Sequence, residues 1–87
     1  MLVSRAENLL KSGDFASARL LLRRAADSSA NAALMLGATF DPRIIHDIGP
    51  IGIEPDIAQA RQWYEKAVQL GSEVAVQRLA KLTQMAP

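Results

Sequence analysis

The chain has 87 residues and a formal net charge of +1, from 10 basic and 9 acidic residues spread along its length. This balance excludes the basic stripe of a nucleic-acid-binding surface, and no apolar stretch is long enough to span a membrane. No nucleic-acid partner and no direct membrane binding are therefore expected. The lack of cysteine excludes disulfides and thiolate metal sites, and no signal peptide is evident, so the compartment is left open.

The first segment predicts a helix whose apolar face carries Leu2, Ala6, Leu9 and Leu10. Ser4 and Glu7 have the spacing of a capping box, so we expect this helix to begin at Ser4. Gly13 marks the region where it should end, because glycine commonly follows the last turn of a helix.

A second helix is predicted over 15–27, with Asp14 as its N-cap. Its expected buried face carries Phe15, Ala18, Leu21, Leu22 and Ala25. Ser28 and Ser29 interrupt the pattern and can cap a third helix over 30–39.

The next stretch, FDPRIIHDIGPIGIEPD over 40–56, is an unusually apolar connection. Within it, Asp41 can cap a short helix near 42–48, with Pro42 at the first helical position and Gly49 at the end. Three isoleucines would share one face of that helix, Ile44, Ile45 and Ile48. We expect this face to pack back over the neighbouring helices; if exposed, it would be a contact patch for a partner.

Two more helices follow the connection. Asp56 opens a helix over 57–70 with capping-box spacing, and its apolar face carries Ile57, Ala60, Tyr64 and Ala67. Gly71 should end this helix, and Ser72 can cap a closing helix with the apolar set Ala75, Leu79 and Leu82. No segment alternates as a strand would, so the sequence predicts an all-α fold of antiparallel hairpins.

The helical pattern repeats along the chain. Ala-x-x-x-Leu recurs in the first helix of each hairpin, as Ala6/Leu10, Ala32/Leu36 and Ala75/Leu79. Asp-x-x-x-Ala-Arg occurs at 14–19 and again at 56–61, and each copy leads to a small residue, Ala25 or Ala67. We therefore predict one domain over 1–87 with repeat one at about 2–28, repeat two at about 30–70 and a closing helix at about 72–84.

This arrangement is an α-α superhelix of about two and a half repeats, with five main helices plus a short helix near 42–48. A single hairpin cannot bury its own apolar face, so neighbouring repeats must stack. Two and a half repeats are few for a stable stack. We therefore expect the chain to be part of a larger protein or to self-associate.

The second repeat resembles the Sel-one-like repeat, a relative of the tetratricopeptide repeat. That family's pattern is Ala-x-x-x-Leu-Gly-x-x-Tyr, a Gly-x-Gly-Val loop, and then Asp-x-x-x-Ala-x-x-Trp-Tyr-x-Lys-Ala-Ala-x-x-Gly. The matching residues are Ala32, Leu36, Gly37, Gly52, Asp56, Ala60, Trp63, Tyr64, Lys66, Ala67 and Gly71, with Phe40, Ile53 and Val68 as close substitutes. Repeat one is similar to the shorter tetratricopeptide form.

The chain departs from this pattern inside the apolar connection. Pro50 occupies the first glycine position of the loop, and about seven residues are inserted between Phe40 and Gly52. The resemblance implies that Trp63 and Tyr64 pack between helices; ligand stacking by this pair is the alternative.

The resemblance further implies a non-catalytic protein–protein interaction or scaffold module that binds a protein or peptide on a concave surface. The first helix of each pair would line that surface, and the predicted partner-binding side chains are Arg5, Asn8, Asn31, Met35, Gln77 and Arg78. The alternative is a structural helical segment that self-associates or docks on other domains of its parent chain. Both hypotheses remain open at this point.

The polar residues contain no pattern typical of an enzyme. His46 and Asp47 form a lone pair without a third orienting group or a nucleophile, and no ligand pair has metal-binding spacing. No catalytic, cofactor-binding or metal site is therefore expected. Arg19, Arg23 and Arg24 form either a solvated helix face or a contact for an acidic partner peptide.

Overall fold

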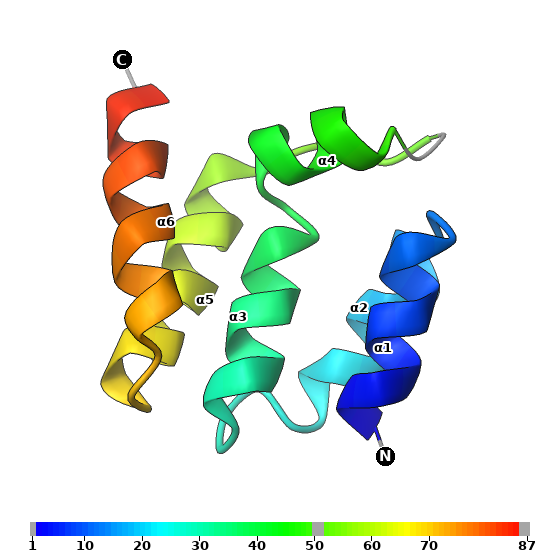
Figure 1. Ribbon diagram of the computed structural model, residues 1–87, viewed down its shortest axis with the longest axis horizontal. Helices are drawn as coiled ribbons and strands as arrows, with labels where there is room; N and C mark the ends of the chain where they lie inside the picture. The colour runs from blue at the N-terminus through cyan, green and yellow to red at the C-terminus, as the bar shows by residue number, and fades with distance from the viewer. Residues whose placement is uncertain (1, 50–51, 86–87) are drawn as a thin grey trace.

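The computed structural model describes residues 2–49 and 52–85, which form six helices joined by short connections (Figure 1). The helices are α1 (Leu2–Lys11), α2 (Phe15–Arg23), α3 (Ala30–Ala38), α4 (Pro42–Ile48), α5 (Ile57–Gln69) and α6 (Glu73–Met85). The described residues contain no strand, which confirms the all-α prediction with five main helices and a short one. Within the same ranges, no helix is long and apolar enough to cross a membrane.

The helices stack as antiparallel hairpins. Helix α1 pairs with α2, α3 pairs with α5, and α6 lies against α5, with α1, α3 and α6 in one row (Figure 1). The overall extents are 30 × 28 × 16 Å, and the short dimension is that of two helix layers about 8–10 Å apart. The inserted α4 lies across one end of this stack, directly after α3 (Figure 1).

The predicted caps of α2, α3, α5 and α6 form as expected. Asp14 accepts a hydrogen bond from the backbone N–H of Ser17 at 3.1 Å, and Asp56 accepts one from Gln59 at 3.1 Å. Ser29 and Ser72 cap α3 and α6 in the same way. These bonds satisfy backbone donors that have no partner within their own helix.

The predicted start of α1 at Ser4 is wrong, because the helix already includes Leu2 and Ser4 lies inside it. A cap contributes only about 1 kcal/mol, whereas packing of an apolar face supplies most of the stability of a helix in a protein. In α1, Ala6 is fully buried and Leu9 and Leu10 pack against the core. Packing of this face stabilises α1, and Ser4 lies within the helix instead of before it.

The second helix is shorter than predicted. It ends at Arg23, and both Ala25 and Ala26 donate backbone hydrogen bonds to the Leu22 carbonyl, at 3.0 and 2.9 Å. This tightening of the last turn rotates the following residues, so Ala26 is fully buried instead of the predicted Ala25, which is only half-buried. In repeat two, the residue seven positions after Ala60 is Ala67, and it is buried. In repeat one, the residue seven positions after Ala18 is Ala25, but the buried residue is the next one, Ala26.

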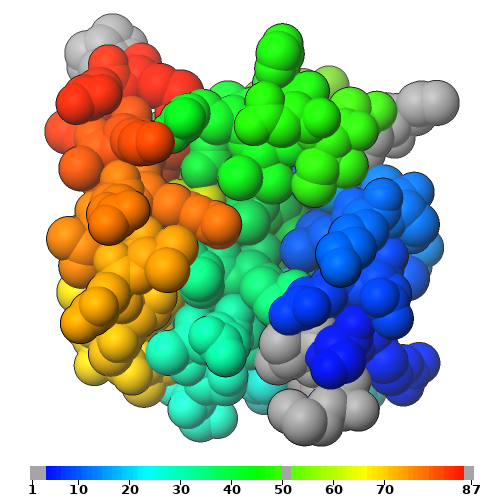
Figure 2. All heavy atoms as spheres, viewed as in Figure 1, coloured from blue at the N-terminus to red at the C-terminus, as the bar shows by residue number. Residues whose placement is uncertain are grey.

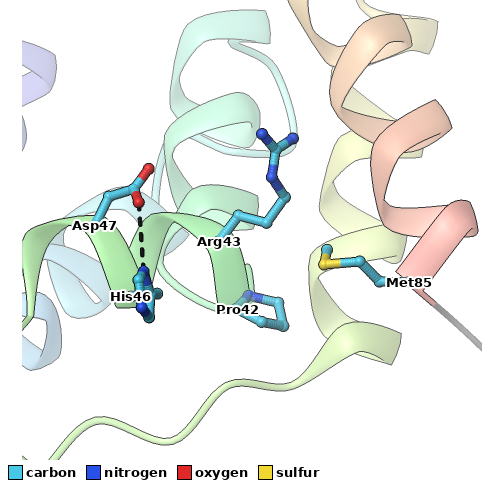
Figure 3. A pocket seen from close by; sticks show the side chains of 5 residues that line it. All are labelled: Pro42, Arg43, His46, Asp47 and Met85. Atoms are coloured by element: carbon cyan, nitrogen blue, oxygen red, sulfur yellow. Dashed lines mark ion pairs between the residues drawn. The ribbon is translucent and has the colours of Figure 1, made fainter.

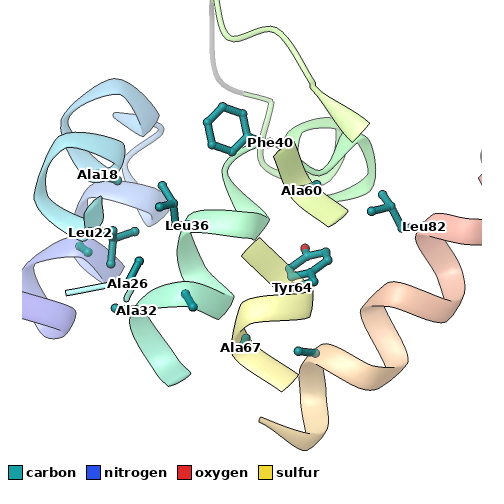
Figure 4. Close-up of a cluster of buried hydrophobic side chains, with 13 residues drawn as sticks. Ala18, Leu22, Ala26, Ala32, Leu36, Phe40, Ala60, Tyr64, Ala67 and Leu82 are labelled. Carbon is teal, nitrogen blue, oxygen red and sulfur yellow. The ribbon is translucent and has the colours of Figure 1, made fainter. Parts of the chain in front are cut away.

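Small residues bring the helices of the core close together, and a few large side chains fill the remaining space (Figure 4). The tightest approach is between Gly37 of α3 and the fully buried ring of Tyr64 in α5. A Cβ atom at position 37 would lie 2.6 Å from Cδ1 of that ring. Position 37 therefore has to be glycine for α3 and α5 to keep this distance.

Arg19 ties the apolar connection to the first hairpin. Its guanidinium donates to the Thr39 carbonyl at 2.6 Å and to the Thr39 hydroxyl at 3.2 Å, and it stacks 3.9 Å from the centroid of the Phe40 ring. Burial, followed by the charge of Arg23, lowers the pKa of Arg19 from its ordinary value. The prediction of a solvated face or peptide contact is wrong for Arg19, since its donors bind the end of α3.

Candidate functional site

A buried hydrogen bond fixes the beginning of α4. The Asp41 side chain is only 3% exposed; one carboxylate oxygen accepts the Tyr64 hydroxyl at 2.7 Å and the other accepts the Arg43 backbone N–H at 2.9 Å. The predicted N-cap of α4 is thus confirmed, and the same side chain also bonds α5. Burial, and then the bond to Asp41, raises the pKa of the Tyr64 hydroxyl above its ordinary value, while the charge of Arg78 counteracts the rise.

The surface is hollowed between α4 and α6. A hollow of about 210 Å³ separates Asp41, Arg43, Ile44 and Asp47 on one side from Val74, Gln77, Arg78 and Lys81 on the other. Figure 2 shows the surface hollowed between these two helices. We call this hollow, with the two that adjoin it at Arg43, the α4–α6 groove.

The two adjoining hollows extend the groove toward the end of α6. One, of about 270 Å³, lies between Pro42, Arg43, His46 and Asp47 and the Met85 side chain, as Figure 3 shows. The other, of about 320 Å³, is lined by Arg43, Lys81, Gln84 and Met85. Because all three share Arg43, the groove follows α4 and the facing side of α6.

Charged and apolar side chains alternate in the α4–α6 groove. Arg43 and Lys81 are exposed, whereas Arg78 is half-buried with its guanidinium carbon 6.0 Å from the centroid of the Tyr64 ring. Val74 is 48% exposed on the α6 side of the groove, and the half-buried Ile44 lies on the α4 side. The groove therefore offers cations and apolar surface at the same place.

The predicted partner-binding residues separate into two groups. Gln77 and Arg78 line the α4–α6 groove. Arg5, Asn8 and Asn31 are exposed on α1 and α3, outside the groove, and Met35 is half-buried against the core. A role for these six side chains in partner binding stays a prediction.

The insertion patch is partly covered. Ile44 and Ile45 are half-buried, whereas Ile48 is 42% exposed, and no residue of α4 is fully buried. Neither Ile44 nor Ile45 is among the half-buried side chains that pack against the core, so both the expected packing of this face and its role as a contact patch stay predictions. Pro50, which stands in place of the first loop glycine of the resembled family, lies outside the described residues.

The sequence analysis did not place Arg43, Val74 or Lys81 in a binding surface. Val74, Arg78 and Lys81 follow the i, i+4, i+7 spacing of one helix face, and this was the available signal. The position of Arg43 had no such signal, because it depends on how α4 crosses the stack.

The remaining candidate residues of the sequence analysis are either exposed on the surface or packed in or against the core. The side chains of His46 and Asp47 are 89% and 76% exposed, and His46 Nδ1 lies 3.5 Å from the Asp47 carboxylate (Figure 3). Tyr64 is a core residue, and Trp63 is half-buried against that core at the edge of another surface hollow. Within the described ranges, no three His, Cys, Asp or Glu side chains are grouped as metal ligands.

Comparison with known proteins leaves the family open. No family model matches this chain, no curated protein matches it, and no solved structure matches its fold. The resemblance to the Sel-one-like repeat therefore remains a prediction from the residues, while the all-helical stack of hairpins is established by the structure.

Proposed function

We propose that this chain is a non-catalytic protein–protein interaction module that holds a segment of a partner protein in the α4–α6 groove. The observation that carries the proposal is the groove itself, in which exposed cations stand beside the exposed apolar side chain of Val74. Binding sites for peptides combine an apolar contact with a few polar groups that set orientation.

The way in which α4 is held supports the same reading. The Asp41–Tyr64 hydrogen bond fixes the beginning of α4, which forms one wall of the groove. A wall that is ordered before binding reduces the entropy that association must overcome. The resemblance to helical repeats, which bind partners on the surfaces of their stacks, points in the same direction.

The test is to select peptides on the immobilised chain from a displayed random library and to measure their affinity for two variants. Gln77→Trp places a bulky ring in the groove, and Gln62→Trp places the same ring on an exposed part of α5 away from it. We expect about tenfold weaker binding to the first variant and unchanged binding to the second. Peptides that bind Gln77→Trp as tightly as wild type would contradict the proposal.

A second function, self-association or docking on another part of a parent chain, is favoured by different residues. Val76 and Leu70 are exposed apolar side chains, and Val76 lies two positions along α6 from Val74, on another face of the helix. Light scattering over a concentration series tests this function. A dimer that Val76→Lys dissociates would support it, and a monomer at all concentrations would exclude self-association.

A further inference from the structure

Three cationic side chains from two helices face one another across the α4–α6 groove. Arg78 and Lys81 lie three residues apart on α6, and Arg43 stands opposite on α4. Side chains three residues apart share one face of a helix. Like charges converge here on an open hollow of about 210 Å³.

Two carboxylates, those of Asp41 and Asp47, also line this hollow. Asp41 accepts the Tyr64 hydroxyl and the Arg43 backbone N–H, and Asp47 lies next to His46. Among the described residues, no carboxylate is within ion-pairing distance of the side chains of Arg43, Arg78 or Lys81. The cations of the groove are therefore available to an external anion.

The apolar part of the groove decides which kind of anion fits. Val74 and Ile44 lie beside the cations, and neither is covered by another part of the described chain enough to bury it. An inorganic phosphate or a lipid headgroup would pair with the cations but leave these two side chains in contact with water. A peptide that carries carboxylates beside an aliphatic side chain covers both.

We infer that the ligand of this groove is an acidic, partly apolar segment of a partner protein. Its Asp or Glu carboxylates pair with Arg43, Arg78 and Lys81, and an aliphatic side chain between them packs on Val74 and Ile44. The arginine forks suit carboxylates because two parallel N–H···O bonds form at once. This inference rests on the proposed function and adds the chemistry of the bound segment.

The experiment repeats the peptide selection on two charge-reversed chains that have the same net charge. Arg43→Glu/Lys81→Glu reverses two exposed cations of the groove, and Lys11→Glu/Arg24→Glu reverses two exposed cations outside it. Because all four side chains are exposed, both variants should fold, and circular dichroism melts check this.

We expect wild type and the Lys11→Glu/Arg24→Glu control to enrich Asp and Glu over the starting library, and Arg43→Glu/Lys81→Glu to lose this enrichment. A selected peptide in which every Asp becomes Asn and every Glu becomes Gln should bind about tenfold more weakly, and added salt should weaken the acidic peptide. Arg78→Gln, with its melt as a control for folding, should weaken binding in the same direction.

Three outcomes would overturn the inference. If the selected peptides show no acidic bias but bind Gln77→Trp weakly, the proposed function stands and the acidic ligand is refuted. Preferential binding to phosphatidylserine vesicles, or displacement of the peptide by millimolar inorganic phosphate, would assign the cations to a phosphate group. Failure to select any peptide would refute both proposals.

Discussion

Replacing Tyr64 with phenylalanine removes one buried hydroxyl group and leaves the ring against Gly37. In the folded chain that hydroxyl donates to Asp41 at 2.7 Å, and the Asp41 side chain is 3% exposed. Without it, one carboxylate oxygen is buried without its donor, which costs about 1–3 kcal/mol. We therefore expect the free energy of unfolding of Tyr64→Phe to fall by about 2 kcal/mol, measured by urea denaturation followed by circular dichroism.

A double-mutant cycle with Asp41→Asn separates the hydrogen bond from other effects of each change. Asparagine keeps an oxygen that accepts the Arg43 N–H, so it removes the charge while the helix cap remains. The two changes should be non-additive by about 1 kcal/mol or more, because both alter the one hydrogen bond that these side chains share. Additive effects, or a loss below about 0.5 kcal/mol in Tyr64→Phe, would refute the reasoning.

The pH dependence gives an independent check, since Tyr64 is the only tyrosine of the chain. Burial raises its pKa in the folded state, so its contribution is fully present below the ordinary tyrosine pKa of about 10. Above that pH the unfolded chain loses the proton first, and the free energy of unfolding falls by up to about 1.4 kcal/mol per pH unit. The stability difference between wild type and Tyr64→Phe should therefore shrink from about pH 9 to about pH 11.

Three further predictions concern packing and capping, each measured by urea denaturation. Gly37→Ala should destabilise by about 1–2 kcal/mol, because overpacking against the buried ring exceeds the gain in helix propensity; a gain in stability would contradict the close contact. Arg19→Gln should cost about 1–2 kcal/mol, whereas the exposed control Arg23→Gln should change stability by less than about 0.5 kcal/mol. Asp14→Ala should cost about 1 kcal/mol and Ser4→Ala much less; equal costs would restore Ser4 as the cap.

Local interactions explain why the helices were predictable. Asp14, Ser29 and Asp41 each cap a helix through a backbone N–H two or three residues away, and Gly49 ends α4 at a φ of +71°. Such contacts depend on neighbouring residues alone, so they can be read from spacing. Ser4 has the same spacing but lies inside α1, so the spacing by itself does not fix where a helix begins.

The candidate site was less predictable because its parts come from distant segments. Gln77 and Arg78 were expected to line a partner surface, and they do lie in the α4–α6 groove, but the predicted side chains of α1 and α3 do not. Arg43 belongs to an insertion that the repeat pattern does not describe. Its place opposite Lys81 is set by the hydrogen bond between Asp41 and Tyr64, which joins residues 23 positions apart.

The six helices, most of their caps and the small residues along their buried faces could be predicted from the sequence, because periodicity and capping act over a few residues. The contacts between residues far apart in the sequence depend on how the hairpins stack, so only the tertiary structure shows them. It brought the half-buried Arg19 into contact with Thr39 and Phe40, since the end of α3 lies within reach of α2. It also placed α4 across the stack, and thereby brought the cations of two helices to the two sides of one groove.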